Sequence, residues 1–390
     1  MKPFIPLEEF QDRVVRIQKG MKEQGLDLLL AFGNEAEPQF VRYLSDYWPS
    51  FESAGVLIPA EGTPVLLIGP ETLTFAKDRS KIPDIRRLLV FRESSDPEYP
   101  GSKLDTFKSV ISELLDRAPK KVGIAGWAII PQTIFSEFSK AVTEIGGEAP
   151  VKADQVMIAV RAIKSENELN CMREAYRITT IGFETVLDQL RPGMTELQAR
   201  GIALAAMSEA GMESEAYPFW CLCGDGTNQA ISRSRHKPLE KGQIIQLQVG
   251  ARYNGYASSI GRPVVFGKAT DEARALIEAG ISGQAAILST LKAGIPAKEV
   301  SNAYEAAIAK AGYSDWLLYG PCHATGLMEG EPPWIESNST WILQENMTFC
   351  VDVFLGNKEK GIGLRFEDGV RVTGSGVEEF SNLRREVIEL

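Results

Sequence analysis

Four short stretches after residue 160 decide the fold of the chain: RAIKS at 161–165, GARYNGY at 250–256, HATGL at 323–327 and GLRFED at 363–368. The first stretch leads directly into a long helical pattern over residues 166–190. From there the pattern is a helix pair followed by strands, and the same order then repeats. This order favours two similar halves within one domain, although no sequence repeat proves it.

Two capping boxes mark the start of the first helix pair. Ser165 with Glu168, and Thr195 with Gln198, stand three residues apart. At this spacing each side chain accepts a hydrogen bond from the other residue's backbone N–H, which satisfies donors that the first helical turn leaves without a partner. We therefore expect helices to begin directly after Ser165 and directly after Thr195.

The first 150 residues alternate between helical and strand patterns, which is typical of an α/β layer domain. Leu28–Phe32 is a short, continuously apolar run that suits a buried strand. Ser53–Ile58 and Thr63–Ile68 read as two strands separated by a turn that contains proline and glycine, so we expect a hairpin. Because the pattern changes near residue 150, we expect an N-terminal domain at residues 1–155 and a second domain at residues 156–390.

The composition limits the kind of partner. The chain has 42 Lys and Arg against 52 Asp and Glu, which gives a formal net charge of −10 at pH 7. An acidic balance disfavours nucleic acid and anionic membranes, because both are recognised by basic surfaces. The longest apolar runs are far shorter than the ~20 residues that cross a bilayer. We expect a cytoplasmic protein with a small-molecule or dipeptide-like substrate and no nucleic-acid or membrane partner.

Histidine and cysteine limit the chemistry further. The chain has only two histidines, His236 and His323, so a site with three imidazoles cannot be built within it. Cys221 and Cys223 form the one close pair among five cysteines, and no second pair completes a zinc site. We interpret the cysteines as reduced and mostly packed, and Cys350 as a small buried hydrophobic residue.

The four stretches match, in order and spacing, the C-terminal catalytic domain of the creatinase, prolidase and aminopeptidase P family, which has the pita-bread fold. Lys241–Gly242, Arg262 and Glu331–Pro333 extend the match, and Tyr43–Asp46 resembles the smaller N-terminal domain of the family more loosely. The resemblance covers nearly the whole chain. It implies an α/β N-terminal domain followed by an α+β pita-bread domain, and a homodimer.

The resemblance also points to an altered metal site. In the metallopeptidase members, five side chains hold two divalent metals, and four of the five are carboxylates. The five positions are occupied here as follows: Gln248, Ser259, His323, Asp352 and Glu367. Two carboxylates cannot balance two dications in a desolvated cleft, and an amide and a hydroxyl are weak ligands. We therefore expect no cofactor, and the alternative is a single divalent metal on His323, Asp352 and Glu367.

Two further departures concern proton transfer. The active members of the family have histidines at the positions of Ile231 and Gly330. Creatinase works without metals and relies on the histidine at the position of Ile231 as its general acid and base, so that mechanism cannot operate here unchanged. His323 is then the only imidazole in the expected cleft, and a neighbouring carboxylate would orient it and set its pKa.

The polar side chains expected in the cleft form a catalytic group and a substrate-binding group: His323, Glu367 and Asp352 for catalysis, and Arg365, Gln248 and Ser259 for binding. Strand alternation supports this grouping, because residues two apart share a face. It places Arg365 beside Glu367 and Cys350 beside Asp352. The alternative for Arg365 and Glu367 is an ion pair that only holds two strands together.

A loop of the N-terminal domain is a further candidate for substrate binding. It contains Trp48, Phe51 and Glu52 and lies where creatinase relatives use a loop of the small domain to close the active site of the dimer partner. Aromatic rings with one carboxylate suit an amphipathic or cationic ligand. The alternative is that this loop packs against its own domain or at the dimer interface.

Three functions are consistent with these residues. The first is a metal-independent, creatinase-like hydrolase or lyase that cleaves a carbon–nitrogen bond of a small amino-acid-like or amidine-like substrate. The second is a non-catalytic module that binds a ligand or a partner. The third is a one-metal dipeptidase of the Xaa-Pro type. The first function is our expectation, because His323 and a carboxylate pair are retained while both aspartates are lost.

Overall fold

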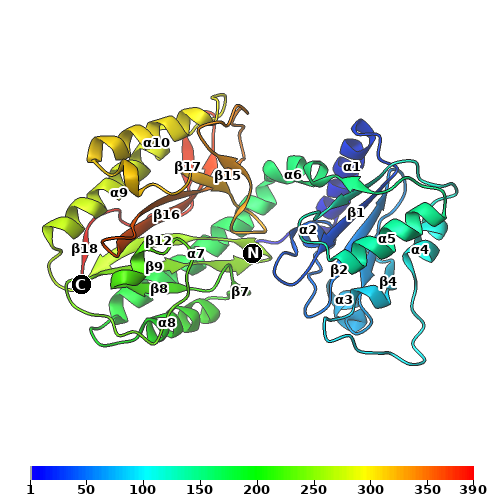
Figure 1. Cartoon of the computed structure of the whole chain (residues 1–390), viewed down its shortest axis with the longest axis horizontal. Coiled ribbons are helices and arrows are strands. Elements are labelled where there is room, and N and C mark those ends of the chain that lie inside the picture. The colour runs from blue at the N-terminus through cyan, green and yellow to red at the C-terminus, as the bar shows by residue number, and fades with distance from the viewer. Residues whose placement is uncertain (1) are drawn as a thin grey trace. The chain divides into compact units, whose positions relative to one another are not determined.

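The computed structural model describes residues 2–390 and is drawn in Figure 1. The chain divides into two compact units: Ile5–Arg161, which we call the N-terminal unit, and Ala162–Leu390 together with the residues up to Phe4, which we call the C-terminal unit. Within residues 2–390, no helix is both long and apolar enough to cross a membrane.

The N-terminal unit is built around a six-stranded mixed sheet with the strand order β4-β3-β2-β1-β5-β6. Its strands are β1 (Leu28–Gly33), β2 (Ala54–Pro59), β3 (Val65–Ile68), β4 (Ile85–Arg87), β5 (Val122–Ala125) and β6 (Val151–Lys152). Its helices are α1 (Leu7–Glu23), α2 (Gln39–Ser45), α3 (Leu73–Arg79), α4 (Phe107–Leu114), α5 (Gln132–Glu144) and α6 (Asp154–Ala162). The predicted hairpin is confirmed, since β2 and β3 pair antiparallel.

Burial on both faces explains why β1 is apolar along its length. Leu28, Leu30 and Phe32 join a buried cluster with residues of α4 and α5. Leu29 and Ala31 alternate with them and point to the opposite face, where α2 packs. A strand that is covered on both sides has a continuous apolar run instead of an alternating one. The expected α/β layer architecture is therefore confirmed.

The C-terminal unit contains a nine-stranded sheet whose main path runs β14-β13-β15-β16-β12-β9-β8, with β17 paired to β16 and β18 to β12. Its strands are β8 (Trp220–Cys223), β9 (Ile244–Val249), β12 (Ile260–Val265), β13 (Cys322–Ala324), β14 (Glu331–Ile335), β15 (Thr348–Asn357), β16 (Ile362–Val372), β17 (Val377–Glu379) and β18 (Ile388–Glu389). A small separate sheet is formed by β7 (Ser214–Glu215), β10 (Ala251–Tyr253) and β11 (Tyr256–Ala257).

Two helix pairs pack on the large sheet, each against its own half, as Figure 1 shows. The four helices are α7 (Glu166–Gln189), α8 (Glu196–Glu209), α9 (Asp271–Thr290) and α10 (Lys298–Ala311). α7 and α8 share a buried cluster with β8, β9 and β12, whereas α9 and α10 share another with β13, β15 and β16. The order of a helix pair followed by strands therefore occurs twice in three dimensions as well as along the chain.

Both predicted capping boxes are present. The Ser165 hydroxyl accepts from the Glu168 N–H at 3.1 Å, and the Glu168 carboxylate accepts from the Ser165 N–H at 2.9 Å. Thr195 and Gln198 make the same reciprocal pair at 3.2 and 2.8 Å. The helix starts expected from the sequence are therefore confirmed.

Ser165→Ala is expected to lower the free energy of unfolding by about 1 kcal/mol, because alanine cannot accept the hydrogen bond from the N–H of Glu168. Urea unfolding followed by circular dichroism measures this loss. Ser289→Ala is the matched control, since Ser289 is an exposed serine in the last turns of α9 and caps no helix start. Equal losses in the two variants would contradict the capping role.

A buried ion pair joins β12 to β16. Nη2 of Arg262 donates to both carboxylate oxygens of Asp368, at 2.9 and 2.8 Å, and both side chains are 0% exposed. The Asp368 carboxylate also accepts from Ser381, Gln284 and Arg385. Every charge in this group is hydrogen-bonded, which is the condition under which a buried ion pair is tolerated. The group fixes the position of β16 in the sheet.

Candidate metal centre and substrate pocket

Three neighbouring strands carry the candidate site. β13 contributes His323, β15 contributes Cys350 and Asp352, and β16 contributes Arg365 and Glu367. His323 stands opposite Cys350 in the strand register, and Asp352 stands opposite Glu367. Opposite residues on adjacent strands, and residues two apart on one strand, project from the same face. The sheet therefore brings these five side chains to one side.

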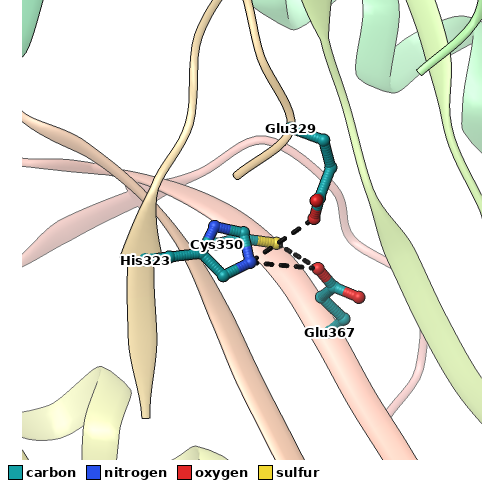
Figure 2. A group of neighbouring side chains, drawn as sticks. All are labelled: His323, Glu329, Cys350 and Glu367. Carbon is teal, nitrogen blue, oxygen red and sulfur yellow. Dashed lines mark hydrogen bonds and ion pairs between the residues drawn. The ribbon is translucent and has the colours of Figure 1, made fainter. Parts of the chain in front are cut away.

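Four side chains converge in a compact group, shown in Figure 2, that we call the four-donor cluster: His323, Glu329, Cys350 and Glu367. Their nitrogen, sulfur and carboxylate oxygen atoms lie within 4.8 Å of one another. The Cys350 thiol donates to Oε1 of Glu367 at 2.7 Å. Nε2 of His323 lies 3.4 Å from Oε1 of Glu329 and 3.8 Å from Oε1 of Glu367. Glu329 comes from the loop between β13 and β14, and the other three come from strands.

The surroundings of His323 indicate which ring nitrogen faces the cluster as a ligand atom. Its Nδ1 lies 3.1 Å from the carbonyl oxygen of Ala324. A carbonyl oxygen only accepts, so a hydrogen on Nδ1 satisfies this contact and leaves a lone pair on Nε2. That lone pair faces two carboxyl groups, and such a contact is favourable when a cation lies between them or when one carboxyl is protonated and donates to Nε2. Histidines that bind metals through Nε2 commonly donate from Nδ1 in this way.

The electrostatics of the cluster favour a bound cation. Burial raises the pKa of Glu367 well above its ordinary value, and the charges of Glu329 and Asp352 raise it further. Burial likewise raises the pKa of Glu329. When ionised, the carboxylates of Glu329, Asp352 and Glu367 outnumber the guanidinium groups of Arg365 and Arg252 that act on Glu329, and a divalent cation would offset the excess of negative charge.

An unsatisfied atom points to the same conclusion. Among the described residues, Oε2 of Glu367 is buried and has no hydrogen-bond partner, and such an atom is costly unless an ion or water contacts it. One imidazole, two carboxylates and one thiol form a donor set that suits a transition-metal dication. The residues present therefore fit a single divalent metal.

Asp352 lies outside the four-donor cluster and holds a different pair of residues. The Tyr319 hydroxyl donates to its Oδ2 at 2.7 Å, and Nε of Arg365 lies 3.1 Å from its Oδ1. Nη2 of Arg365 donates to the carbonyl oxygen of Ala230 at 2.8 Å. Burial lowers the pKa of Arg365, but the negative charges around it, that of Asp352 first, together outweigh this and the net pKa is raised. The alternative of an ion pair between Arg365 and Glu367 is wrong within the described chain, since Arg365 pairs with Asp352.

Gln248 and Ser259, the two positions at which the family resemblance led us to expect aspartates, lie together in the structure. Nε2 of Gln248 donates to the Ser259 hydroxyl at 3.4 Å, and the same hydroxyl bonds to the hydroxyl of Tyr217 at 2.7 Å. A Cβ at Gly261 would lie 2.2 Å from Oε1 of Gln248, so the glycine makes room for this side chain. Oε1 of Gln248 is buried without a hydrogen-bond partner in the part of the chain that the structure describes.

A pocket of about 370 Å³ is lined by three residues of the four-donor cluster: His323, Glu329 and Glu367. Its lining combines a polar patch with an apolar and aromatic wall: Gln248, His323, Glu329, Gly330, Asp352, Arg365 and Glu367, with Tyr217, Trp220, Ala230, Ile231, Leu318, Tyr319 and Trp334. Ile231, Leu318 and Trp334 are 82%, 64% and 42% exposed. An apolar pocket of this size with a few convergent polar groups is typical of a small-molecule site.

The candidate loop of the N-terminal unit is partly engaged within that unit. Arg42 stacks over the ring of Trp48 at 3.9 Å. Glu52 is buried and accepts hydrogen bonds from the N–H groups of Glu71 and Thr72 and from the Thr72 hydroxyl at 2.7 Å, so its carboxylate holds the turn that leads into α3. Phe51 is 81% exposed. A role for Trp48, Phe51 and Glu52 in substrate binding stays a prediction.

Known protein families account for both units of the chain. Residues 170–374 match the profile described as Metallopeptidase family M24, and residues 13–163 match the Creatinase/Prolidase N-terminal domain. The first match alone spans more than half of the chain. The chain belongs to metallopeptidase family M24. The prediction of a hydrolase of the M24 type, acting on carbon–nitrogen bonds, is thereby confirmed at the level of the family.

Individual relatives agree with this assignment to family M24. The Xaa-Pro dipeptidase of Pyrococcus furiosus is 24% identical over 379 residues, which cover 97% of this chain and 100% of that protein. The peptidase YqhT of Bacillus subtilis is 27% identical over 231 residues, which cover 59% of this chain and only 65% of that protein.

Solved structures of similar proteins show the same fold. The prolidase from Thermococcus sibiricus superposes with a TM-score of 0.84 at 21% identity, over 98% of this chain and 99% of that chain. The X-Pro aminopeptidase from Thermotoga maritima superposes with a TM-score of 0.83 at 23% identity, over 97% of this chain and 99% of that chain. The predicted fold, an α/β N-terminal domain followed by a pita-bread domain, is confirmed.

The expectation that this protein has no cofactor is wrong. The chain belongs to a metallopeptidase family, and the four-donor cluster offers a complete set of ligand atoms. The expectation relied on the loss of carboxylates at Gln248 and Ser259. It overlooked that residues at other positions can supply ligand atoms to a metal alongside His323 and Glu367, the two expected family ligands that remain.

Sequence reasoning missed Glu329. It correctly expected Cys350 to be a buried, reduced cysteine but did not connect it with the metal site. A signal for Cys350 existed, because strand alternation already placed it on the site face. Glu329 was adjacent to Gly330, where active relatives have a substrate-contacting histidine, but only the path of the loop shows that its carboxylate turns toward His323. The single-metal alternative named Asp352 as a ligand, whereas the structure places it outside the four-donor cluster.

Proposed function

We propose that this protein is a hydrolase that cleaves a peptide-type carbon–nitrogen bond of a small, dipeptide-like substrate with one divalent cation. The observation that carries the proposal is the convergence of four ligand atoms beside the pocket, which His323, Glu329 and Glu367 line. Relatives named Xaa-Pro dipeptidase support a dipeptide as the substrate class. The one-metal dipeptidase is therefore preferred to a metal-independent creatinase-like enzyme.

The side chains of the four-donor cluster differ in their exposure and in whether a strand or a loop carries them, which suggests different roles. A bound dication supplies Lewis-acid polarisation of a carbonyl oxygen and a water of lowered pKa. His323 and Glu367 are fixed on neighbouring strands, so they hold their ligand atoms in place. The Glu329 side chain is 23% exposed, against 1% for Glu367, and it comes from a loop. Its carboxylate can accept a proton from the attacking water and pass it to the leaving nitrogen.

Two polar groups are placed to orient the substrate. Oε1 of Gln248 lines the pocket and is an acceptor without a partner in the described chain, so it can accept a hydrogen bond from a substrate N–H. Arg365 is held through its Nε and Nη2 by Asp352 and Ala230. Arg365 lines the pocket, and its guanidinium can donate to a substrate carboxylate.

Ile231, Leu318 and Trp334 form an exposed apolar part of the pocket lining, which suggests that substrates with apolar side chains are preferred. Ile231→Ala is expected to raise KM by about 3- to 30-fold for a substrate with a bulky apolar side chain, since each buried CH₂ contributes roughly 0.8 kcal/mol. KM for a glycine-containing substrate should change little. Ile342→Ala is the matched control, because Ile342 is 47% exposed and is not among the residues that line this pocket in the described structure. An unchanged KM for all substrates would contradict contact with Ile231.

A dipeptide panel tests the proposed function. The full chain, freed of metal by chelator and then loaded with zinc, cobalt or manganese, is assayed on dipeptides with and without proline. Hydrolysis is expected only with metal, and it should be lost in His323→Ala. His236→Ala is the control, because it removes the other, exposed histidine. Turnover that survives both the chelator and His323→Ala would refute the proposal.

The homodimer and the cytoplasmic location stay predictions. Light scattering coupled to size-exclusion chromatography of the full chain tests the dimer, and a mass of about one chain would contradict it.

A further inference from the structure

We propose that Cys350 is a direct ligand of the metal and that its thiolate makes the site selective for a thiophilic cation such as Zn²⁺ or Co²⁺ over Mg²⁺ or Ca²⁺. This inference rests on the proposed function, in that it concerns the same metal. It goes further by replacing a site of carboxylates and one histidine with a site of mixed sulfur, nitrogen and oxygen donors.

The position of Cys350 differs from that of an ordinary packed cysteine. Cys322 belongs to the apolar cluster beneath α9 and α10, together with its strand neighbours Phe349 and Val351 on β15. Cys350 lies between these two residues on β15 and therefore points away from that cluster. Its sulfur instead meets the carboxylate of Glu367 at 2.7 Å, in a buried and polar environment.

The strand register places the sulfur beside the family histidine. Cys350 stands directly opposite His323 in the antiparallel pair of β13 and β15, and side chains at such positions are close neighbours on one face. Sγ therefore lies within 4.8 Å of the ligand atoms of His323, Glu329 and Glu367. One cation could contact all four atoms.

Asp352, the carboxylate that the family resemblance suggested as a metal ligand on β15, interacts with other residues. Asp352 accepts a hydrogen bond from Tyr319 and pairs with Arg365. Cys350 stands two residues earlier on the same strand face, and its Sγ supplies the ligand atom that Asp352 does not. Oε2 of Glu367 is buried and has no hydrogen-bond partner among the described residues, so a ligand in this cleft would satisfy an atom that is otherwise costly to bury.

The donor set decides the kind of metal. Thiolate and imidazole select zinc-like transition metals. His323, Cys350 and Glu367 on the strands would leave the fourth position of a tetrahedral ion open for water, with the carboxylate of the loop residue Glu329 beside it. Magnesium and calcium prefer six or more oxygen ligands, which this cluster does not provide among the described residues. On binding, the S–H bond breaks, a sulfur–metal bond forms and the proton is released to solvent. No electron is transferred, so no oxidant or reductant is needed.

Cobalt spectroscopy of the full chain tests the ligation apart from catalysis. The metal-free protein is titrated with Co²⁺, and a thiolate-to-cobalt charge-transfer band in the near ultraviolet is expected. The band should persist in Cys322→Ala and disappear in Cys350→Ala, while the weaker visible bands of bound Co²⁺ remain at higher cobalt concentrations. A wild-type protein that binds Co²⁺ without the band, or that binds no Co²⁺, would overturn the proposal.

X-ray absorption at the metal edge of the wild-type protein removes any dependence on the folding of the variants. A sulfur neighbour at about 2.3 Å is expected, the usual zinc–thiolate distance. A shell of nitrogen and oxygen alone would overturn the ligation by Cys350. The two proposals fail separately: a sulfur neighbour without dipeptide hydrolysis refutes only the function, and hydrolysis without a sulfur neighbour refutes only the thiolate ligand.

Discussion

Glu367→Gln is expected to lower kcat/KM for a dipeptide by on the order of 10³-fold, because several kcal/mol of transition-state stabilisation depend on a metal that this residue helps to hold. Glutamine keeps the shape of the side chain but replaces a charged ligand by a weak one. Glu367 has both neighbours that matter, His323 and Cys350, within reach of its Oε1. The loss should therefore appear in kcat as well as in metal affinity.

Steady-state kinetics at saturating zinc or cobalt measure this effect, and circular dichroism shows whether the variant is folded. Glu359→Gln is the matched control, since Glu359 is an exposed glutamate in the turn between β15 and β16. It should retain the wild-type activity. A Glu367→Gln protein that is folded, loaded with metal and within tenfold of wild type would contradict the role of Glu367.

Asp368→Leu is expected to destabilise the C-terminal unit by about 3–5 kcal/mol, because it leaves the fully buried guanidinium of Arg262 without its counter-charge. Urea unfolding measures the loss. The double variant Arg262→Met with Asp368→Leu should be more stable than Asp368→Leu alone, since no unpaired charge then stays buried at this pair.

A surface ion pair near the same segment provides the control. Arg384 and Glu386 lie 2.9 Å apart with their side chains 57% and 54% exposed. Glu386→Gln should therefore change the free energy of unfolding by no more than about 1 kcal/mol. If Asp368→Leu cost as little as this control, the buried pair would not contribute to fixing β16.

Sequence patterns predicted most of the fold because its determinants are local. The apolar run of β1 indicates a strand that is buried on both faces, and the capping boxes at Ser165 and Thr195 indicate where two helices begin. The ordered motifs of the C-terminal unit then specify the pita-bread arrangement. The apolar run and the capping boxes depend on residues a few positions apart, whereas the pita-bread arrangement followed from the resemblance of four motifs within residues 161–368 to a known family.

The candidate site was only partly predictable, because alternation along a strand shows which side chains share a face but not which atoms they contact. It placed Cys350 with Asp352 correctly. It could not show that Asp352 turns to Arg365 and Tyr319, since that choice depends on a residue distant in sequence. Nor could it place Glu329, because a loop without regular periodicity carries this residue into the cluster.

The number of divalent metal ions bound per chain tests the mononuclear site most directly. Protein purified without chelator, equilibrated with zinc or cobalt and dialysed free of excess metal is measured by elemental analysis. One ion per chain is expected in the wild-type protein, and none in His323→Ala. No bound ion in the wild-type protein, or two ions per chain, would contradict the single metal held by His323, Cys350 and Glu367.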